Sequence, residues 1–169
     1  MAKVAFLLAS NFEDSEMENP YKAVKKAGHE AVIIGNEKGI TCTGKHKKVS
    51  YFTELSSKEV NAQDYDAVII PGGAAPETLR INQATVDFVK NLDKDSKLIA
   101  SICHGAQVMI SADILKNKEA TCFIGIRDDL INSGATYLDQ EVVVSGNLIT
   151  SRTPKDEPAF IREILTKLA

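Results

Sequence analysis

A cysteine followed by a histidine and a glycine, Cys103-His104-Gly105, is the segment of this sequence best suited to covalent chemistry. The apolar run before it, Leu98 to Ile102, indicates a buried strand, and the residues after it can begin a helix. A sharp turn from a strand into a helix exposes the side chain at the turn, as in a nucleophile elbow. We therefore predict that Cys103 is a reactive thiol, with a pKa lowered by the positive end of the following helix.

Cys103 and His104 could also have purely structural roles. A buried structural cysteine is the commoner fate of cysteine in general, and His104 could simply cap the start of the helix. His104 directly follows the thiol, so its side chain leaves the backbone in a different direction. It could still act as a general acid or base on a bound substrate, because histidine titrates near neutral pH.

Four short apolar runs must position this turn. They lack the apolar–polar alternation of half-exposed strands. Such continuous apolar runs are typical of strands buried on both faces of a parallel sheet covered by helices. The runs are Val4 to Ala9, Ala31 to Ile34, Ala67 to Ile70 and Leu98 to Ile102, and the helical patterns are Asn19-Pro20 to Gly28, Asn82 to Leu92 and Pro154 to Leu168. The alternation predicts a doubly wound, flavodoxin-like α/β fold, in which helices sandwich a mostly parallel sheet.

Two stretches interrupt the alternation of strands and helices. The lysine- and threonine-rich segment Gly39 to Tyr51 predicts a β-ribbon or extended loop at the edge of the sheet. Gly146-Asn147, between two short apolar runs, is a two-residue hairpin signal. No linker or repeat divides the chain, so we expect residues 1–169 to form a single domain.

In an open parallel sheet, functional groups gather outside the carboxyl ends of the strands. Glu13 follows the first run, Pro71-Gly72-Gly73 follows the third, and Cys103 follows the fourth. Gly72 and Gly73 could present backbone N–H groups to a developing negative charge, although such a pair is also ordinary turn chemistry. A carboxylate under a thiol would have a raised pKa and could hydrogen-bond to the thiolate, whereas a loop carboxylate is usually solvated.

Composition excludes several classes of partner. The formal net charge of -3, from 23 acidic and 20 basic residues, gives no field that would attract nucleic acid or an anionic membrane. Val4 to Ala9 is too short for a signal peptide, and no run approaches the ~20 apolar residues of a membrane span. We expect a soluble cytoplasmic protein.

Three cysteines at wide spacings fit neither a disulfide framework nor a zinc site, so we expect reduced thiols, no metal and no cofactor. Cys42 lies in a polar segment and is predicted to be exposed, whereas Cys122 precedes apolar residues and is predicted to lie in the core. The basic cluster Lys45 to Lys48 is interpreted as a solvated surface, with anion binding as a remote alternative.

The sequence resembles the PfpI-like intracellular cysteine peptidases, in the superfamily that also contains protein deglycases and glutathione-independent glyoxalases. The resemblance extends almost from end to end. The matching segments are Asn11-Phe12-Glu13-Asp14, Thr43-Gly44-Lys45-His46, Tyr65-Asp66-Ala67, Pro71-Gly72-Gly73, Ala100 to Gly105, Arg127 to Asn132 and Ser151-Arg152.

The resemblance implies a role for each matching position. Cys103 would be the nucleophile, His104 its catalytic partner, and Glu13 the carboxylate that hydrogen-bonds to the sulfur. Gly73 and His104 would offer backbone amides to an oxyanion. Glu77 of a neighbouring subunit would orient the histidine, so the active site would lie at the interface of a homodimer or larger homo-oligomer.

Two positions depart from the family pattern. Ala106 stands where the family usually has proline after Cys-His-Gly, a change that the start of a helix should tolerate. Phe123 aligns with a tyrosine that is common near the site in archaeal peptidase-like members, so any role of that hydroxyl is absent here. This departure weakens the assignment as a peptidase more than it weakens the prediction that Cys103 is a reactive thiol.

Three functions are compatible with these residues. The first, which we favour, is a stress-protection hydrolase of the intracellular peptidase or amidase type with a Cys-His-Glu site, in which Cys103 attacks an acyl carbon. The second is a glyoxalase or deglycase, in which the thiolate adds to a reactive aldehyde such as methylglyoxal and Glu13 or His104 moves a proton. The third is a redox-responsive stress protein in which Cys103 is oxidised to the sulfinic acid.

Overall fold

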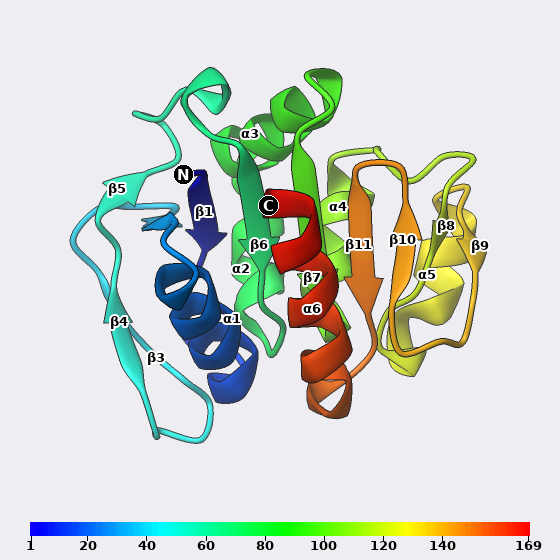
Figure 1. Cartoon of the computed structure of the whole chain (residues 1–169), viewed down its shortest axis with the longest axis horizontal. Coiled ribbons are helices and arrows are strands. Elements are labelled where there is room, and N and C mark those ends of the chain that lie inside the picture. The colour runs from blue at the N-terminus through cyan, green and yellow to red at the C-terminus, as the bar shows by residue number, and fades with distance from the viewer.

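A seven-stranded sheet forms the centre of the protein, whose computed structural model describes residues 1–169 (Figure 1). The strand order is β10-β11-β7-β6-β1-β2-β5, and every neighbouring pair is parallel except β10 with β11. The strands are β1 (Lys3–Leu7), β2 (Glu30–Gly35), β5 (Leu55–Ser56), β6 (Ala67–Ile70), β7 (Leu98–Ile102), β10 (Val143–Ser145) and β11 (Leu148–Ser151). The predicted flavodoxin-like α/β fold is confirmed.

Helices cover both faces of this sheet. In Figure 1, α1 and α6 lie in front of the strands, and α2, α3 and α4 lie behind them. The helices are α1 (Asp14–Lys26), α2 (Ala75–Arg80), α3 (Gln83–Lys94), α4 (Ala106–Ser111), α5 (Arg127–Asn132) and α6 (Glu157–Leu168). Side chains of β1 alternate between the two layers: Val4 and Phe6 pack on the α1 and α6 side, and Ala5 and Leu7 on the other.

Most predicted elements appear where the sequence placed them. The third and fourth apolar runs coincide with β6 and β7, and Asn82 caps α3 by accepting the N–H of Thr85 at 3.2 Å. The hairpin at Gly146-Asn147 joins β10 to β11. None of the helices combines the length and apolar character that a bilayer crossing requires.

The first helix begins earlier than predicted. α1 starts at Asp14, and Pro20 lies inside it rather than at its first position. Asn19 is not the cap; its Nδ2 donates to Glu157 Oε1 of α6 at 2.6 Å. Side-chain contacts of the four residues Glu13 to Glu16 hold this extra N-terminal part of the helix.

The lysine- and threonine-rich segment forms a separate antiparallel ribbon of β3 (Thr41–Thr43) and β4 (Ser50–Phe52). The prediction that Cys42 is exposed was wrong: its side chain points inward from the ribbon and is buried, because successive strand residues face opposite sides. Cys122 is buried, as predicted. A second small pair, β8 (Glu119–Ala120) and β9 (Thr136–Tyr137), was not anticipated.

Candidate active site

Cys103 occupies a sharp turn at the carboxyl end of β7. Its φ of 61° lies in the left-handed region, and a single turn of 3-10 helix, Cys103–Gly105, leads into α4. Such a conformation is unusual for a residue other than glycine. Gly105 is required by close packing, because a Cβ there would collide with the carbonyl oxygen of Ile70. The predicted sharp turn from strand to helix is confirmed, but Cys103 at the turn is buried rather than exposed.

A buried carboxyl group, that of Glu16, lies beside this turn. The backbone N–H of Gly72 donates to Glu16 Oε1 at 2.9 Å, and Oε2 has no hydrogen-bond partner. A Cβ on Gly72 would lie 2.5 Å from that Oε1 and 2.9 Å from the Cβ of Cys103. Glu16, Gly72 and Cys103 are therefore packed so tightly that only glycine fits between the acid and the thiol.

The structure corrects the position expected for Glu13. Glu13 Oε2 forms an ion pair with Lys45 Nζ at 2.6 Å, and Oε1 lies 3.1 Å from His46 Nε2. Glu13 has no hydrogen bond to the sulfur of Cys103, because it precedes the first turn of α1 and its side chain reaches toward the loop after β3. Glu16, one turn further along the helix, occupies the place next to the thiol.

Burial controls the protonation of Glu16 and Cys103. Burial raises the pKa of Glu16 to about 8, the Gly72 N–H opposes this rise, and the charge of Glu13 adds to it. Burial likewise raises the pKa of Cys103 to about 12, the charge of Glu16 adds to the rise, and the backbone N–H groups of His104 and Gly73 oppose it. The expected lowering of the thiol pKa was therefore wrong, since burial outweighs the short helix that follows. At neutral pH a carboxylic acid lies beside a thiol.

His104 completes the immediate surroundings of the thiol. Its Nδ1 lies 3.3 Å from Cys103 Sγ, and its ring stacks on Phe123 with centroids 4.7 Å apart. Burial, followed by the charge of Lys45, lowers the pKa of His104, so the ring is neutral at pH 7. A neutral imidazole at this distance can accept the thiol proton.

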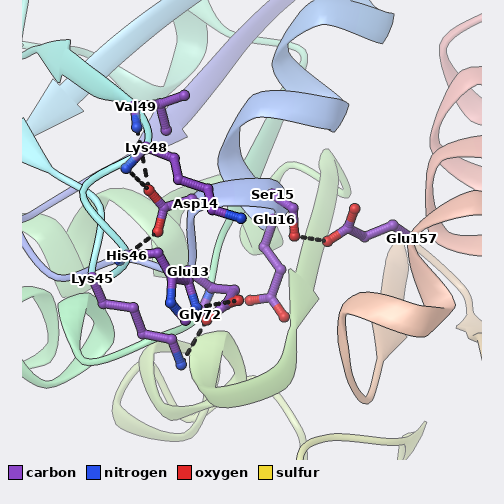
Figure 2. Close-up of polar contacts among 10 residues, drawn as sticks. All are labelled: Glu13, Asp14, Ser15, Glu16, Lys45, His46, Lys48, Val49, Gly72 and Glu157. Atoms are coloured by element: carbon purple, nitrogen blue, oxygen red, sulfur yellow. Dashed lines mark hydrogen bonds and ion pairs between the residues drawn. The ribbon is translucent and has the colours of Figure 1, made fainter.

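Four consecutive residues at the start of α1 each hold a different part of the site, as Figure 2 shows. Glu13 binds Lys45 and His46, and Glu16 binds Gly72. Asp14 accepts the backbone N–H groups of His46, Lys48 and Val49 at 2.8, 3.0 and 3.3 Å. The hydroxyl of Ser15 donates to Glu157 Oε2 at 2.6 Å, which ties α1 to α6. The first turn of α1 thus connects the β3–β4 ribbon, the loop that contains Gly72, and α6.

The pattern of the DJ-1/PfpI family matches residues 2–167. This chain belongs to the DJ-1/PfpI family. Among its relatives, "Deglycase PfpI" of Pyrococcus furiosus is 45% identical, with 98% of this chain and 99% of that protein covered. "General stress protein 18" of Bacillus subtilis is 46% identical, with 98% and 97% covered.

Solved structures of DJ-1/PfpI proteins have the same fold. A protein of Anabaena variabilis with a dj-1/thij/pfpi-like domain and a ferritin-like domain superposes with a TM-score of 0.98 at 43% identity, covering 99% of this chain and 48% of that longer one. DJ-1 of Schizosaccharomyces pombe gives a TM-score of 0.88 at 31% identity, with 99% and 92% covered.

Two residues of this DJ-1/PfpI site were not identified from the sequence. Glu16 lies four residues before Pro20 and eight before Val24, both of which are buried, so it falls on the inward stripe of α1. An acidic residue at an inward position of this helix was the sequence signal that could have identified Glu16 as a site residue. Lys45 was interpreted as solvated surface, and only its contact with Glu13 places it at the site.

Glu77 lies on the exposed side of α2, and its side chain has no hydrogen bond or ion pair within the chain. Its predicted contact with the histidine of another subunit stays a prediction. Gly73 has a φ of 80°, and its N–H is directed at the sulfur together with that of His104. These are the two amides that the family resemblance implies for an oxyanion. Gly72 was also expected to offer its N–H to an oxyanion, but this prediction was wrong, because that N–H donates to Glu16 Oε1.

Proposed function

We propose that this protein is a cysteine-dependent deglycase that acts on adducts of small 2-oxoaldehydes such as methylglyoxal. The observation that supports this most is the neutral carboxyl group of Glu16 on the other side of Gly72 from Cys103, a residue that is only 9% exposed. A buried thiol suits a small carbonyl compound better than a peptide chain. Cys103 does not line any of three surface cavities of about 750, 570 and 380 Å³.

The first step in this proposal is addition of the thiol to the aldehyde carbon. The S–C bond forms as the thiol proton passes to His104 Nδ1, 3.3 Å away. The N–H groups of Gly73 and His104 stabilise the developing oxyanion. Return of a proton to that oxygen gives a neutral hemithioacetal. With an aminocarbinol substrate, the S–C bond replaces the C–N bond, and the thiol proton passes through His104 to the nitrogen, which leaves as the amine.

The second step moves hydrogen between the two adjacent carbons of the bound adduct. A proton leaves the carbon attached to sulfur and a proton is delivered to the neighbouring carbon, while the hydroxyl proton of the hemithioacetal passes to the ketone oxygen. The ketone thus becomes an alcohol, and the hemithioacetal becomes a thioester. Glu16, which is protonated at neutral pH, and His104 are the groups available for these transfers. Water then cleaves the thioester, so that methylglyoxal plus water yields lactate and a proton.

The relatives support the same reaction class. "Protein/nucleic acid deglycase 2" of Escherichia coli is 41% identical, with 98% of this chain and 97% of that protein covered. A hydrolase of the peptidase type is the second candidate, since the Cys103–His104 contact is also what acyl transfer requires. The absent hydroxyl at Phe123 and the burial of the thiol favour the deglycase.

The two candidates are separated by one set of assays. Methylglyoxal and methylglyoxal-treated N-acetylarginine are given to the wild type and to Cys103→Ser, and lactate is measured. A parallel series uses fluorogenic peptides. Lactate from the wild type alone is the expected result; peptide cleavage without lactate would overturn the proposal. If neither activity appears and peroxide readily oxidises Cys103, the redox-responsive alternative is favoured.

The proposal includes a homo-oligomer in which Glu77 of the partner subunit orients His104. Glu77 is exposed and unpaired within one chain, so it is available for this contact. The mass in solution, together with lactate formation by Glu77→Gln, tests this point. A strictly monomeric active protein would eliminate the role of Glu77 and leave that of Cys103 intact.

A further inference from the structure

The backbone of Lys45 is bonded to a segment that lies beside the Cys103 site. Its N–H donates to the carbonyl of Phe12 at 2.9 Å, and Phe12 forms an isolated antiparallel bridge with Gly73. The N–H of the next residue, Glu13, donates to the carbonyl of Gly72 at 3.1 Å. The loop after β3 is thereby connected, through Phe12 and Glu13, to Gly72 and Gly73, which lie close to Cys103 in space.

Glu13 positions the ammonium group of Lys45 but occupies only part of its hydrogen-bonding capacity. Nζ lies 2.6 Å from Glu13 Oε2, while the other oxygen of Glu13 contacts His46. The Lys45 side chain is 46% exposed and that of Glu13 only 13%. An ammonium group has three N–H donors, so two stay available on the open side. Figure 2 shows Lys45 and Glu13 close to Gly72.

The charge of Lys45 acts on the reacting groups. It lowers the pKa of the Cys103 thiol and the pKa of His104, although burial is the largest influence on both groups. Glu16 is protonated at neutral pH, so it supplies no compensating negative charge next to the sulfur. An anionic group on a substrate would therefore meet Lys45 as the cation nearest to the bond that forms.

We propose that Lys45, positioned by Glu13, determines specificity at Cys103 by favouring compounds with a carboxylate next to the carbon that the sulfur attacks. The test by inhibition of lactate formation rests on the proposed deglycase function, whereas recognition of the carboxylate requires only a reactive thiol. The carboxylate product of thioester hydrolysis forms at the carbon bound to sulfur. Lys45 is thus placed to hold the product as well.

Glyoxylate is a suitable probe because it is an aldehyde attached directly to a carboxylate. Its aldehyde carbon can bond to Cys103 Sγ while the thiol proton passes to the former carbonyl oxygen. The resulting hemithioacetal cannot rearrange, since the neighbouring carbon is already a carboxylate. Glyoxylate should therefore act as a reversible dead-end inhibitor whose binding depends on Lys45.

The first test compares alkylation of Cys103 by iodoacetate and by iodoacetamide, followed by mass spectrometry. Each reagent forms an S–CH2 bond and releases iodide, and only iodoacetate is charged. Lys45→Met should lower the iodoacetate-to-iodoacetamide rate ratio about fivefold, the effect of one half-exposed charge contact. A change in thiol pKa alters both rates and cancels in the ratio.

Matched variants and salt make this test decisive. Lys45→Arg keeps the charge and should keep the ratio, and Lys48→Met removes a charge from the same loop without a side-chain contact at the site. Raising the salt concentration should lower the wild-type ratio, because salt screens exposed charges, and this holds even if Lys45→Met fails to fold. A ratio unaffected by both Lys45→Met and salt would overturn the inference.

The second test measures inhibition of lactate formation by glyoxylate and by its uncharged methyl ester. Lys45→Met should weaken inhibition by glyoxylate about fivefold and leave inhibition by the ester unchanged. Equal loss with both compounds would contradict a charge-specific role. If the wild type forms no lactate, the proposed function fails, while the alkylation ratio still decides the role of Lys45.

Discussion

The backbone N–H of Gly72 and the carboxyl group of Glu16 are joined by a buried hydrogen bond of 2.9 Å. This bond holds one oxygen of the acid, and the other oxygen has no partner within the chain. Since Gly72 also touches Cys103, one glycine sets the spacing between the acid and the thiol.

Glu16→Gln should lower the rate of lactate formation by 100-fold or more, because glutamine keeps the acceptor for Gly72 but cannot transfer a proton. The wild-type rate should also fall as pH rises through about 8, since the acid form is required and Glu16 ionises there. The pH profile of kcat measures both effects. Full activity in Glu16→Gln would remove Glu16 from the mechanism.

Gly72→Ala should abolish most activity and destabilise the fold by about 1–3 kcal/mol, because the new methyl group would overlap Glu16 and Cys103. Gly28→Ala is the control: its φ of 91° strains the backbone, yet nothing lies within 4 Å of the added carbon. Urea unfolding and activity per folded molecule are measured for both. Equal activity in the two variants would show that packing at Gly72 is unimportant.

Phe123→Ala should shift the acid limb of kcat/KM to higher pH. The stacked ring helps to bury His104, burial lowers the pKa of that imidazole, and exposure would return the pKa toward about 6.5. The neutral base would then be lost at a higher pH than in the wild type. Phe123→Leu keeps apolar cover and should shift less. An unchanged limb in both variants would argue against His104 as the base.

Asp14→Asn should loosen the loop after β3 and cost about 1–3 kcal/mol, since three backbone N–H groups depend on this carboxylate. Burial alone would raise the pKa of Asp14, but these hydrogen bonds outweigh it and lower the pKa. The stabilisation is therefore present above the unfolded pKa of about 3.9 and is lost as pH falls below it. Faster hydrogen exchange at His46, Lys48 and Val49 is the direct measurement, and unchanged exchange would refute the assignment.

Periodicity and turn chemistry were enough to predict the scaffold. Buried parallel strands appear in the sequence as unbroken apolar runs, so β6 and β7 were located to the residue. The turn at Cys103 follows from a strand, a cysteine and a glycine in succession. These signals are local, which is why the elbow could be predicted without knowledge of the packing.

The protonation states and the partner of the thiol depend on packing between distant segments. Glu13 and Glu16 are both acidic residues after the first strand, and only the start of α1 at Asp14 decides which one faces Cys103. The presence of Pro20 favoured a later helix start and concealed this distinction. Lys45 reaches the site through an ion pair with a residue 32 positions earlier, which periodicity cannot reveal.

The four contacts made by Glu13 to Glu16 also limit how this site can be altered. Each α-helical residue is rotated by about 100° from the next, so a one-residue insertion or deletion here would turn all four side chains away from their partners together. Point substitutions remove one contact at a time, but changes in length remove the whole set. Transplanting the thiol into another scaffold would therefore require the first turn of α1 to be moved with it as one unit.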